Sequence, residues 1–259
     1  MKHDRIFDGL AHCFQRKIYS NNDPRGAIRL HIVQQDLLQH LFMFQPLQAL
    51  DAGGGMGQMT GWLAAQGHSV TLVEPSREML QVAQRQFELD KALDPTKINL
   101  QQCTIQFFTE ENDTEFDLVV CHAVLEWLAD PQQTLAQLLA ALKQGGYLSL
   151  MFFNRNAKVM RHLLGGDLQT VLDNRIASDG NNGLAPISPL LPEEVAGWLP
   201  ELGLELVSWS GVRCFYDYSH PEVRKKMVLD EVLELERRFS RQEPWRSLAR
   251  YQHMICRRL

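Results

Sequence analysis

The 259-residue sequence lacks a long apolar run: no segment approaches the roughly 18 residues that a membrane span requires. Its first residues, MKHDRIFDGLAHCF, carry charges and histidines through the first dozen positions, which excludes a secretory signal peptide. The five cysteines lie apart without a C-x-x-C pair, so we expect free, buried thiols in a reducing compartment. These absences together predict a soluble cytoplasmic protein with no membrane partner and no bound metal.

The sequence also lacks an excess of positive charge, since 26 Lys and Arg face 31 Asp and Glu. The distribution is uneven, however, because the segment from His220 to the end holds ten basic and six acidic residues. An acidic body with a basic C-terminal segment can still bind a phosphate backbone locally. Charge alone favours the plainer hypothesis that this segment is a solvated helix face.

Apolar strands alternate with amphipathic helices between residues 46 and 153. We expect strands at 47–52, 69–75, 98–103, 116–122 and 147–153. We expect helices at 58–67, at 76–89 with Ser76 as the N-cap, and at 131–146. This alternation is typical of an α/β protein with a doubly wound parallel sheet and helices on both faces.

The rest of the chain divides into flanking segments of one domain. Residues 1–45 form an N-terminal helical cap, with helical spacing from Ile28 to Phe44, ahead of a cofactor-binding core at 46–153. Residues 154–191, rich in Gly and Pro, predict a partly helical insertion or lid. Residues 192–259 complete the domain with C-terminal strands and a basic helix. The elements expected there are a helix at 192–203, a strand at 204–218, an amphipathic helix at 220–242 and a strand at 248–258. The last two strands predict an antiparallel hairpin at the edge of the sheet.

Four glycines follow the first strand in the stretch LDAGGGMGQMT, which runs from Leu50 to Thr60. Bare backbone at this end of a parallel strand lets a ligand approach the peptide planes, and a Cβ at Gly53 or Gly54 would fill that space. Glu74 ends the second strand about 20 residues later, where an acid can accept both hydroxyls of a ribose. Close packing of helix on strand explains one or two glycines but not four with the acid, so we expect a nucleoside site.

The glycine spacing separates two classes of nucleoside. Thr60 stands where the dinucleotide fingerprint G-x-G-x-x-G needs its third glycine. The loop instead resembles the E/D-x-G-x-G-x-G loop of class I methyltransferases, and residues 116–153 are similar to the fourth and fifth strands of that family. The resemblance implies a Rossmann-like, seven-stranded, mostly parallel sheet with an antiparallel last strand, and S-adenosylmethionine as the cofactor.

The same resemblance assigns a set of cofactor-binding residues. They are Arg29, Asp51, Gly53, Gly54, Gly55, Glu74, Thr104, Ile105 and His122. The loop would line the methionine half, Glu74 the ribose, and the residues after the third strand the adenine. His122 would lie beside the methyl donor, although a histidine at a strand end is often a packing or capping residue.

Phrases outside this core, such as RIFDGLAHCFQRKIY, GVRCFYDY and LELERRFSRQEPW, resemble bacterial tRNA methyltransferases that act on 5-carboxymethoxyuridine. The resemblance spans most of the chain and implies methylation of the wobble-base carboxylate to a methyl ester. It also implies that the basic C-terminal segment binds the tRNA anticodon stem-loop. The sequence departs from these proteins in the predicted lid, where LDNRIASDGNNGLAPIS replaces a basic run, so tRNA contact from the lid stays open.

A carboxylate substrate requires cations rather than a general base, because it is already ionised at neutral pH. Arg213 and Arg250, with Tyr251 beside them, are the candidate anchors, since a guanidinium matches a carboxylate with two parallel hydrogen bonds. The competing hypothesis makes these arginines edge charges on a hairpin. Two functional alternatives stay open: methylation of a small-molecule carboxylic acid, and non-catalytic binding of a nucleoside cofactor. A dinucleotide-dependent oxidoreductase fits less well, because the third glycine is missing.

Overall fold

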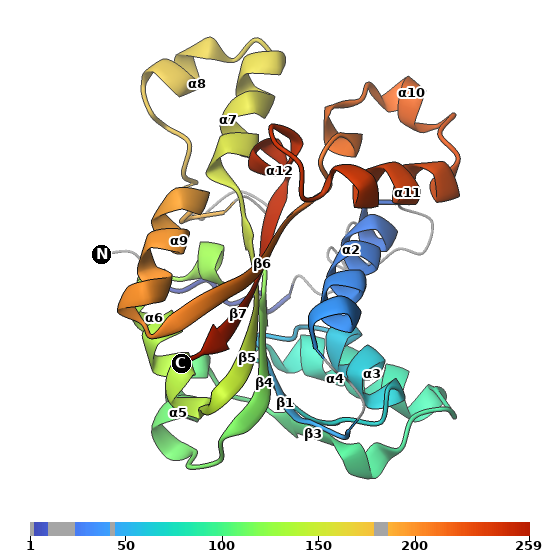
Figure 1. Cartoon of the computed structure of the whole chain (residues 1–259), viewed down its shortest axis with the longest axis vertical. Helices are drawn as coiled ribbons and strands as arrows, with labels where there is room; N and C mark the ends of the chain where they lie inside the picture. Colours follow the sequence, from blue (N-terminus) through green and yellow to red (C-terminus); the bar gives the residue numbers. More distant parts are fainter. Residues whose placement is uncertain (1–2, 10–23, 42–44, 179–185) are drawn as a thin grey trace.

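A single sheet of seven strands organises the molecule (Figure 1), whose computed structural model describes residues 3–9, 24–41, 45–178 and 186–259. The strands are β1 (Gln48–Ala52), β2 (Ser69–Val73), β3 (Ile98–Gln101), β4 (Phe116–His122), β5 (Leu142–Phe153), β6 (Leu204–Val212) and β7 (Tyr251–Arg258). Their order is β3-β2-β1-β4-β5-β7-β6, and all neighbours run parallel except β7, which is antiparallel to both β5 and β6. The predicted mostly parallel sheet with an antiparallel last strand is confirmed.

Helices cover both faces of this sheet, which Figure 1 shows nearly edge-on. One face carries α2 (Pro24–His40), α3 (Gln58–Ala65), α4 (Arg77–Leu89) and α11 (Leu229–Phe239). The other face carries α5 (Ile105–Glu111), α6 (Pro131–Leu138) and α9 (Pro192–Glu201). The predicted N-cap of α4 is confirmed, because the Ser76 hydroxyl accepts a hydrogen bond from the Met79 amide. Among the described residues, no helix has the length and apolar character needed to cross a membrane.

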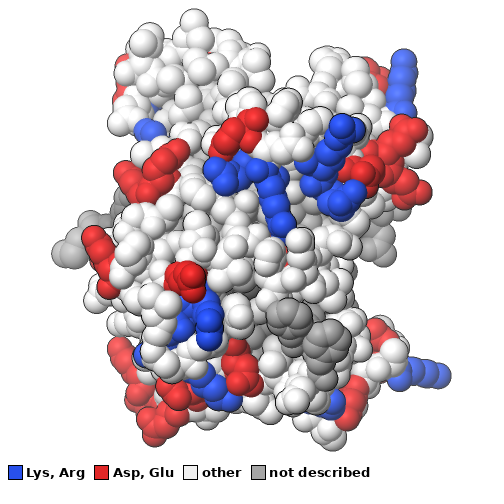
Figure 2. Space-filling model, viewed as in Figure 1, with Lys and Arg blue, Asp and Glu red and all other residues white. Residues whose placement is uncertain are grey.

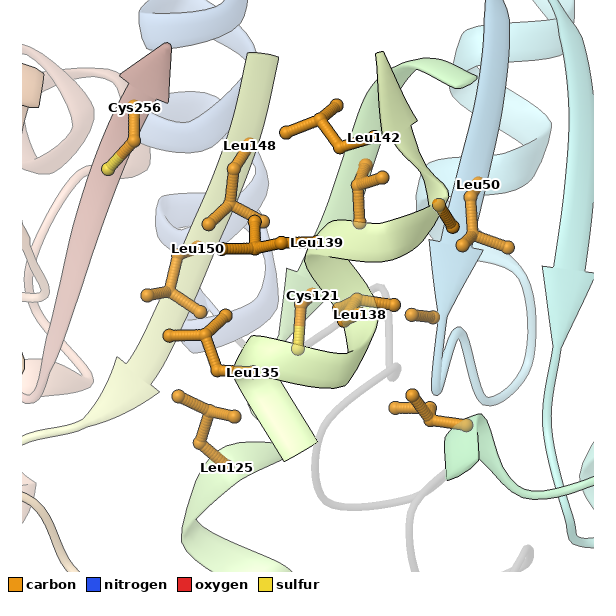
Figure 3. Packing of buried hydrophobic residues seen from close by; sticks show 14 of the residues in the cluster. Leu50, Cys121, Leu125, Leu135, Leu138, Leu139, Leu142, Leu148, Leu150 and Cys256 are labelled. Atoms are coloured by element: carbon orange, nitrogen blue, oxygen red, sulfur yellow. The ribbon is translucent and has the colours of Figure 1, made fainter. Parts of the chain in front are cut away.

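Two apolar cores fill the space between the sheet and its helices. In the core shown in Figure 3, Leu135 and Leu138 of α6 pack against strand residues such as Leu148 and Leu150, and all four are at most 1% exposed. On the opposite face, Ile28 and other residues of α2 pack with α3 against the sheet. Truncating one such buried leucine to alanine costs about 2–5 kcal/mol. The cores therefore hold the carboxyl ends of the strands in a fixed arrangement.

The helix predicted at 131–146 is too long. Helix α6 ends at Leu138, a 3-10 turn (η3, Leu139–Ala141) follows, and residues from Leu142 onward already belong to β5. The strand begins early because Leu142 pairs with Phe116 on β4, and Gly145 takes a φ of 75° at the irregular start of this pairing. The two glycines therefore lie within the strand rather than ending the helix.

Helix α5 follows the third strand directly, where the sequence pattern predicts no element. It begins after Thr104, whose hydroxyl accepts a hydrogen bond from the Phe107 amide and caps the helix. Ile105 and Phe108 bury the inner face of α5. The threonine N-cap was the available signal for this short helix.

The predicted C-terminal helix and strands are also shorter in the structure. The helix expected at 220–242 is two helices, α10 (Pro221–Arg224) and α11, while β6 stops at Val212 and a 3-10 turn (η4, Tyr216–Tyr218) follows. The strand breaks because Arg213 adopts a φ of 65°, which no extended strand permits. Helix α12 (Trp245–Leu248) then leads into β7, three residues later than predicted.

The segment predicted as an insertion or lid is partly helical, as expected. Its described part contains α7 (Arg155–Leu164) and α8 (Leu168–Leu172), which extend beyond the carboxyl end of β5 at the top of Figure 1. Residues 179–185 lie outside the described residues. A lid function for this segment stays a prediction.

Candidate functional site

A cavity of about 350 Å³ lies at the carboxyl ends of the central parallel strands. Gly53 follows β1, Glu74 follows β2, His122 ends β4 and Phe153 ends β5, and all four line it. A second cavity of about 50 Å³ shares Gly53 and His122 with the first, so the two adjoin. This is the place where open α/β sheets bind ligands.

All twelve residues proposed from the sequence line these two cavities. The larger cavity is lined by Arg29, Gly53, Gly55, Glu74, Thr104, Ile105, His122, Arg213, Arg250 and Tyr251. Asp51 and Gly54 line the smaller one. The fold thus brings together residues from the whole length of the chain, and their individual roles stay predictions.

The glycines of the loop make room for neighbouring side chains of the protein, whereas we expected from the sequence that they make room for a ligand. A Cβ at Gly54 would come within 2.6 Å of the Asp51 carboxylate, and one at Gly53 within 2.5 Å of the Val124 side chain. The space beside these glycines is therefore filled by the protein itself, which corrects the expectation that a ligand occupies it. Asp51 is fixed there because its carboxylate accepts hydrogen bonds from the Thr60 amide (3.1 Å) and hydroxyl (2.7 Å) at the start of α3.

Glu74 is tied to the same loop. One carboxylate oxygen accepts from the Gly55 amide at 3.1 Å and the other from the Ser76 amide at 2.9 Å. Burial raises the pKa of Glu74 to about 7, although the two amide hydrogen bonds oppose this shift. The Glu74 carboxyl therefore titrates near neutral pH. Its ionised form is the better hydrogen-bond acceptor for ribose hydroxyls.

His122 ends a buried chain of hydrogen bonds that runs from α2 across the neighbouring strands β7, β5 and β4. Asp36 on α2 pairs with His253 Nδ1 at 2.7 Å, and His253 Nε2 contacts the Ser149 hydroxyl at 2.8 Å. The same hydroxyl lies 2.8 Å from His122 Nε2. Arg241 closes the outer end by donating to Asp36 at 2.7 Å. We call Asp36, His253, Ser149 and His122 the buried relay.

His122 and Asp36, the two end members of the buried relay, both have lowered pKa values. Burial lowers the pKa of His122 well below its usual value, and the charges of His253 and Arg29 act in the same direction. The neutral His122 ring therefore carries a single N–H. Hydrogen bonds from His253 and Arg241 hold the pKa of Asp36 below its usual value, even though burial opposes ionisation. An ionised Asp36 accepts at both oxygens and so orients the relay.

The two arginines at the far end of the cavity differ in their pairing. Arg213 forms an ion pair with Asp217 at 2.5 Å, and both side chains are close to 10% exposed, at 11% and 9%. Arg250 lies over the Phe153 ring, 4.3 Å from its centroid. Its Nε and Nη1 are buried and find no hydrogen-bond partner among the described residues. Arg250 is therefore a buried cation with unsatisfied donors at two of its three guanidinium nitrogens.

One wall of the larger cavity comes from the N-terminal residues, which were not assigned to the site from the sequence. The Arg5 amide donates to the Trp127 carbonyl at 2.9 Å, and the Phe7 ring meets the Trp127 ring edge-on at 4.9 Å. Asp4 accepts from the Ala129 amide at 2.7 Å. Residues 5–7 begin the phrase RIFDGLAHCFQRKIY that carries the family resemblance, but no periodicity places residues 4–7 in the cavity, because their position depends on contacts with the loop after β4. Within the described ranges, no group of three or more His, Cys, Asp or Glu could hold a metal ion.

Comparisons with known proteins match the whole chain. A methyltransferase domain model matches residues 50–148. The sequence is 37% identical to the tRNA 5-carboxymethoxyuridine methyltransferase of Escherichia coli K12, over 98% of this chain and 97% of that protein. It is 27% identical to a ubiquinone biosynthesis O-methyltransferase of Coxiella burnetii, over 73% of this chain and 79% of that protein.

Solved structures with low sequence identity share the fold. Magnesium protoporphyrin IX methyltransferase from Synechocystis PCC 6803, crystallised with bound SAH, superimposes with a TM-score of 0.63 at 13% identity. The match covers 98% of this chain and 96% of that one. The 1,6-didemethyltoxoflavin-N1-methyltransferase of Burkholderia thailandensis gives a TM-score of 0.54 at 19% identity, over 96% of this chain and 87% of that one.

Proposed function

Because the chain belongs to the tRNA 5-carboxymethoxyuridine methyltransferase family, we propose that it methylates the carboxylate of 5-carboxymethoxyuridine at the tRNA wobble position. The product is the methyl ester. The protein is an S-adenosylmethionine-dependent methyltransferase, and the two adjoining cavities suit that cofactor. The small cavity provides Asp51 and Arg29 for the methionine half, and the large one provides Glu74 for the ribose.

The observation that carries the proposal is the unsatisfied guanidinium of Arg250. A buried cation with two unpartnered N–H groups costs free energy unless an anion enters the cavity. Arg213 already forms an ion pair with Asp217, although its Nε and Asp217 Oδ2 are also buried without a partner among the described residues. Arg250 lacks partners at two nitrogens and is the better anchor of the two predicted arginines. A substrate carboxylate would accept the N–H donors of Arg250 and balance its charge.

The chemistry needs little from the protein beyond alignment. S-adenosylmethionine, when bound, supplies a methyl group on a sulfonium, so that a new O–C bond forms as the S–C bond breaks and no proton is released. The residues of the cavity hold the carboxylate in line with that methyl group, a factor worth several kcal/mol of the barrier. Excluding water strengthens the attraction between Arg250 and the anion. The reaction therefore requires residues that orient the carboxylate, such as Arg250, and it requires no general base.

We further propose that the basic residues around α10 and α11 dock the anticodon stem-loop. They are Arg224, Lys225, Lys226, Arg237, Arg238 and Arg241. Lys225 and Arg237 form ion pairs with Glu222 and Glu234 in which every side chain is more than half exposed, so a phosphate can replace these acids. Figure 2 shows basic and acidic side chains intermingled on the face that includes α11. Arg241 is partly committed to Asp36, so the exposed pairs are the better phosphate ligands.

The decisive experiment uses tRNA that carries 5-carboxymethoxyuridine at the wobble position. The purified protein, incubated with this tRNA and S-adenosylmethionine, should produce the methyl ester, detected by nucleoside mass spectrometry. The matched control is the same tRNA with unmodified uridine, which should gain no methyl group. Ester formation on small carboxylic acids but not on the tRNA would overturn the proposed substrate and favour the small-molecule alternative. Cofactor binding without any transfer would favour the non-catalytic one.

A further inference from the structure

Glu126 is a buried carboxyl group in the same cavity as Arg250. It lies on η2 (Leu125–Trp127), the turn that follows β4, and is 1% exposed. Both residues line the large cavity, and the charge of Arg250 acts on the Glu126 carboxyl. No feature of the sequence distinguished this glutamate from the solvated acids of other turns.

The carboxyl of Glu126 is satisfied on one side only. It accepts hydrogen bonds from its own backbone amide and from the amide of Phe153 at the end of β5. Its Oε2 is buried and has no hydrogen-bond partner among the described residues. Buried polar atoms are nearly always paired, so an unpaired oxygen in a cavity points to a ligand atom that is missing.

The protonation of Glu126 decides what that ligand atom can be. Burial raises the pKa of Glu126 to about 8, although the amide hydrogen bonds and Arg250 oppose the shift. At neutral pH the group therefore carries a proton. Because the amides occupy the other oxygen, the proton resides on Oε2, which becomes a hydrogen-bond donor.

We propose that Glu126 binds the substrate carboxylate as a neutral acid, donating from Oε2 beside the donors of Arg250. This inference rests on the proposed function. Together the two residues hold the carboxylate oxygen that does not receive the methyl group, which leaves the other oxygen free to react. Glu126 thereby adds a directed contact to the charge of Arg250 and places no second anion in the cavity.

Ionisation of Glu126 would abolish this arrangement. A charged Glu126 would pair with Arg250 and repel the incoming carboxylate. The other titratable groups near it do not take its place: Arg213 and Asp217 neutralise each other, and burial raises the pKa of the Cys121 thiol far above neutrality. Arg5, from the N-terminal wall, and Tyr251, from β7, also line the cavity. Substrate capture should therefore weaken as pH rises through about 8.

The test compares Glu126→Gln with Glu126→Ala. A glutamine can accept the backbone amides with its oxygen and donate from its NH₂ group, yet it cannot ionise. Single-turnover methylation of the 5-carboxymethoxyuridine tRNA is measured between pH 6.5 and 9.5 for the wild type and both variants. S-adenosylmethionine affinity and thermal unfolding are measured in parallel.

We expect the single-turnover rate constant of the wild type at subsaturating tRNA to fall above pH about 8, and that of Glu126→Gln to stay level across the same range. At pH 7 the glutamine variant should remain within about threefold of the wild type, whereas Glu126→Ala should lose roughly tenfold to a hundredfold with unchanged cofactor affinity. Equal losses in both variants at pH 7, or an alkaline fall that persists in Glu126→Gln, would overturn the inference. A wild type inactive on this tRNA would instead remove the proposed function, and the inference with it.

Discussion

At the scale of single residues, the site contrasts two arginines of the same chemical type. Arg213 is compensated by Asp217, so removing it would leave a buried anion. Asp217 also acts on Arg250 through its charge, but Arg250 Nε and Nη1 have no hydrogen-bond partner among the described residues, so removing Arg250 leaves Asp217 with its Arg213 partner and removes two unsatisfied donors. Removing one member of a buried ion pair is costly because the other charge stays buried without its partner. We therefore expect substitutions of Arg213 and of Arg250 to have different effects on stability.

Arg250→Met should therefore abolish most ester formation, by about a hundredfold or more, without lowering the thermal unfolding temperature. Arg213→Met should destabilise the fold by about 3–5 kcal/mol, because Asp217 is left without its partner. Ester yield by mass spectrometry and thermal unfolding, measured on both variants, check this pair of outcomes. An Arg213→Met variant as stable as the wild type, or an Arg250→Met variant that still forms the ester, would contradict the assignment of Arg250 as the anchor.

The pKa of Glu74 makes cofactor binding dependent on pH. Below about 7 the carboxyl is protonated, and above it the carboxylate can accept from both ribose hydroxyls, so S-adenosylmethionine affinity should increase as pH rises from 6 to 8. In Glu74→Gln this increase should disappear and the affinity at pH 8 should be lower. Calorimetry across this range provides the check. An unchanged pH dependence in the variant would separate Glu74 from the ribose.

The buried relay predicts a remote effect on the same affinity. Ser149→Ala removes the hydroxyl that joins His253 to His122, so the proton of the His122 ring is no longer fixed in place. We expect S-adenosylmethionine affinity to weaken about three- to tenfold, the value of one hydrogen bond. The matched control is Ser210→Ala, which removes a 3.0 Å contact to Asp36 at the other end of the relay. An S-adenosylmethionine affinity of Ser149→Ala equal to that of the wild type would show that the relay does not act on the cofactor.

Local patterns in the sequence brought out the glycine loop and Glu74, but they did not bring out the buried relay or Glu126. The glycine loop and Glu74 lie within about one strand–helix–strand unit, and their spacing in the sequence reflects that geometry. The contact between Asp36 and His253 joins positions 217 apart, and no spacing rule links them. The role suggested here for Glu126 depends on its burial against Phe153, which a sequence pattern cannot express. Contacts made by tertiary packing alone were therefore missed.

At the scale of secondary structure, helix α11 holds the turn after β6 in place through hydrogen bonds. The Glu236 carboxylate on α11 accepts from the amides of Cys214 (2.5 Å), Phe215 (3.2 Å) and Tyr216 (3.0 Å). These three bonds follow directly after Arg213, whose left-handed backbone costs about 1–3 kcal/mol. A helix on one face of the sheet thus fixes the course of a cavity-lining segment.

Glu236→Ala should leave three buried amides without an acceptor and destabilise the protein by several kcal/mol. The turn that carries Arg213 would lose its support, so methylation should fall more than S-adenosylmethionine affinity. Denaturant unfolding and single-turnover kinetics measure the two effects. The exposed Glu231 on the same helix is the control, since Glu231→Ala should change neither quantity.

Boundaries of elements were the least predictable feature at this scale. Periodicity located every strand, yet it extended β6 past Val212 because the apolar pattern continues beyond it. The strand ends there because Arg213 adopts a φ of 65°, and Glu236 on α11 accepts hydrogen bonds from the three amides that follow. Helix α6 was overextended for a similar reason, since pairing between Leu142 and Phe116 draws residues into β5.

At the scale of the whole molecule, the distribution of charge sets how the protein meets a large polyanion. The chain is acidic overall, with a net charge of −5, whereas the C-terminal segment is basic. An acidic body repels nucleic acid at long range, so binding depends on a few local cations. Screening by salt should therefore affect tRNA binding strongly.

If the proposed docking surface is correct, tRNA affinity should fall steeply between 50 and 200 mM salt. Each phosphate contact contributes about 0.7 to 0.9 to the slope of log K against log salt. Replacing Arg237 and Arg238 by alanine should reduce that slope by about 1 to 2. Arg85→Ala, an exposed change on α4, is the matched control and should leave the slope unchanged. Fluorescence anisotropy with labelled tRNA measures both, and a slope indifferent to the paired change would identify these charges as a solvated face.

The position of β7 has a consequence for how the protein is made. This strand is synthesised after β6 but lies between β5 and β6, so β6 cannot join the sheet until the ribosome has delivered residues 251–258. A nascent chain that ends at Val212 already contains the glycine loop and Glu74, but not Arg250 or His253. During synthesis the residues proposed to bind the nucleoside are therefore present before those proposed to bind the tRNA carboxylate.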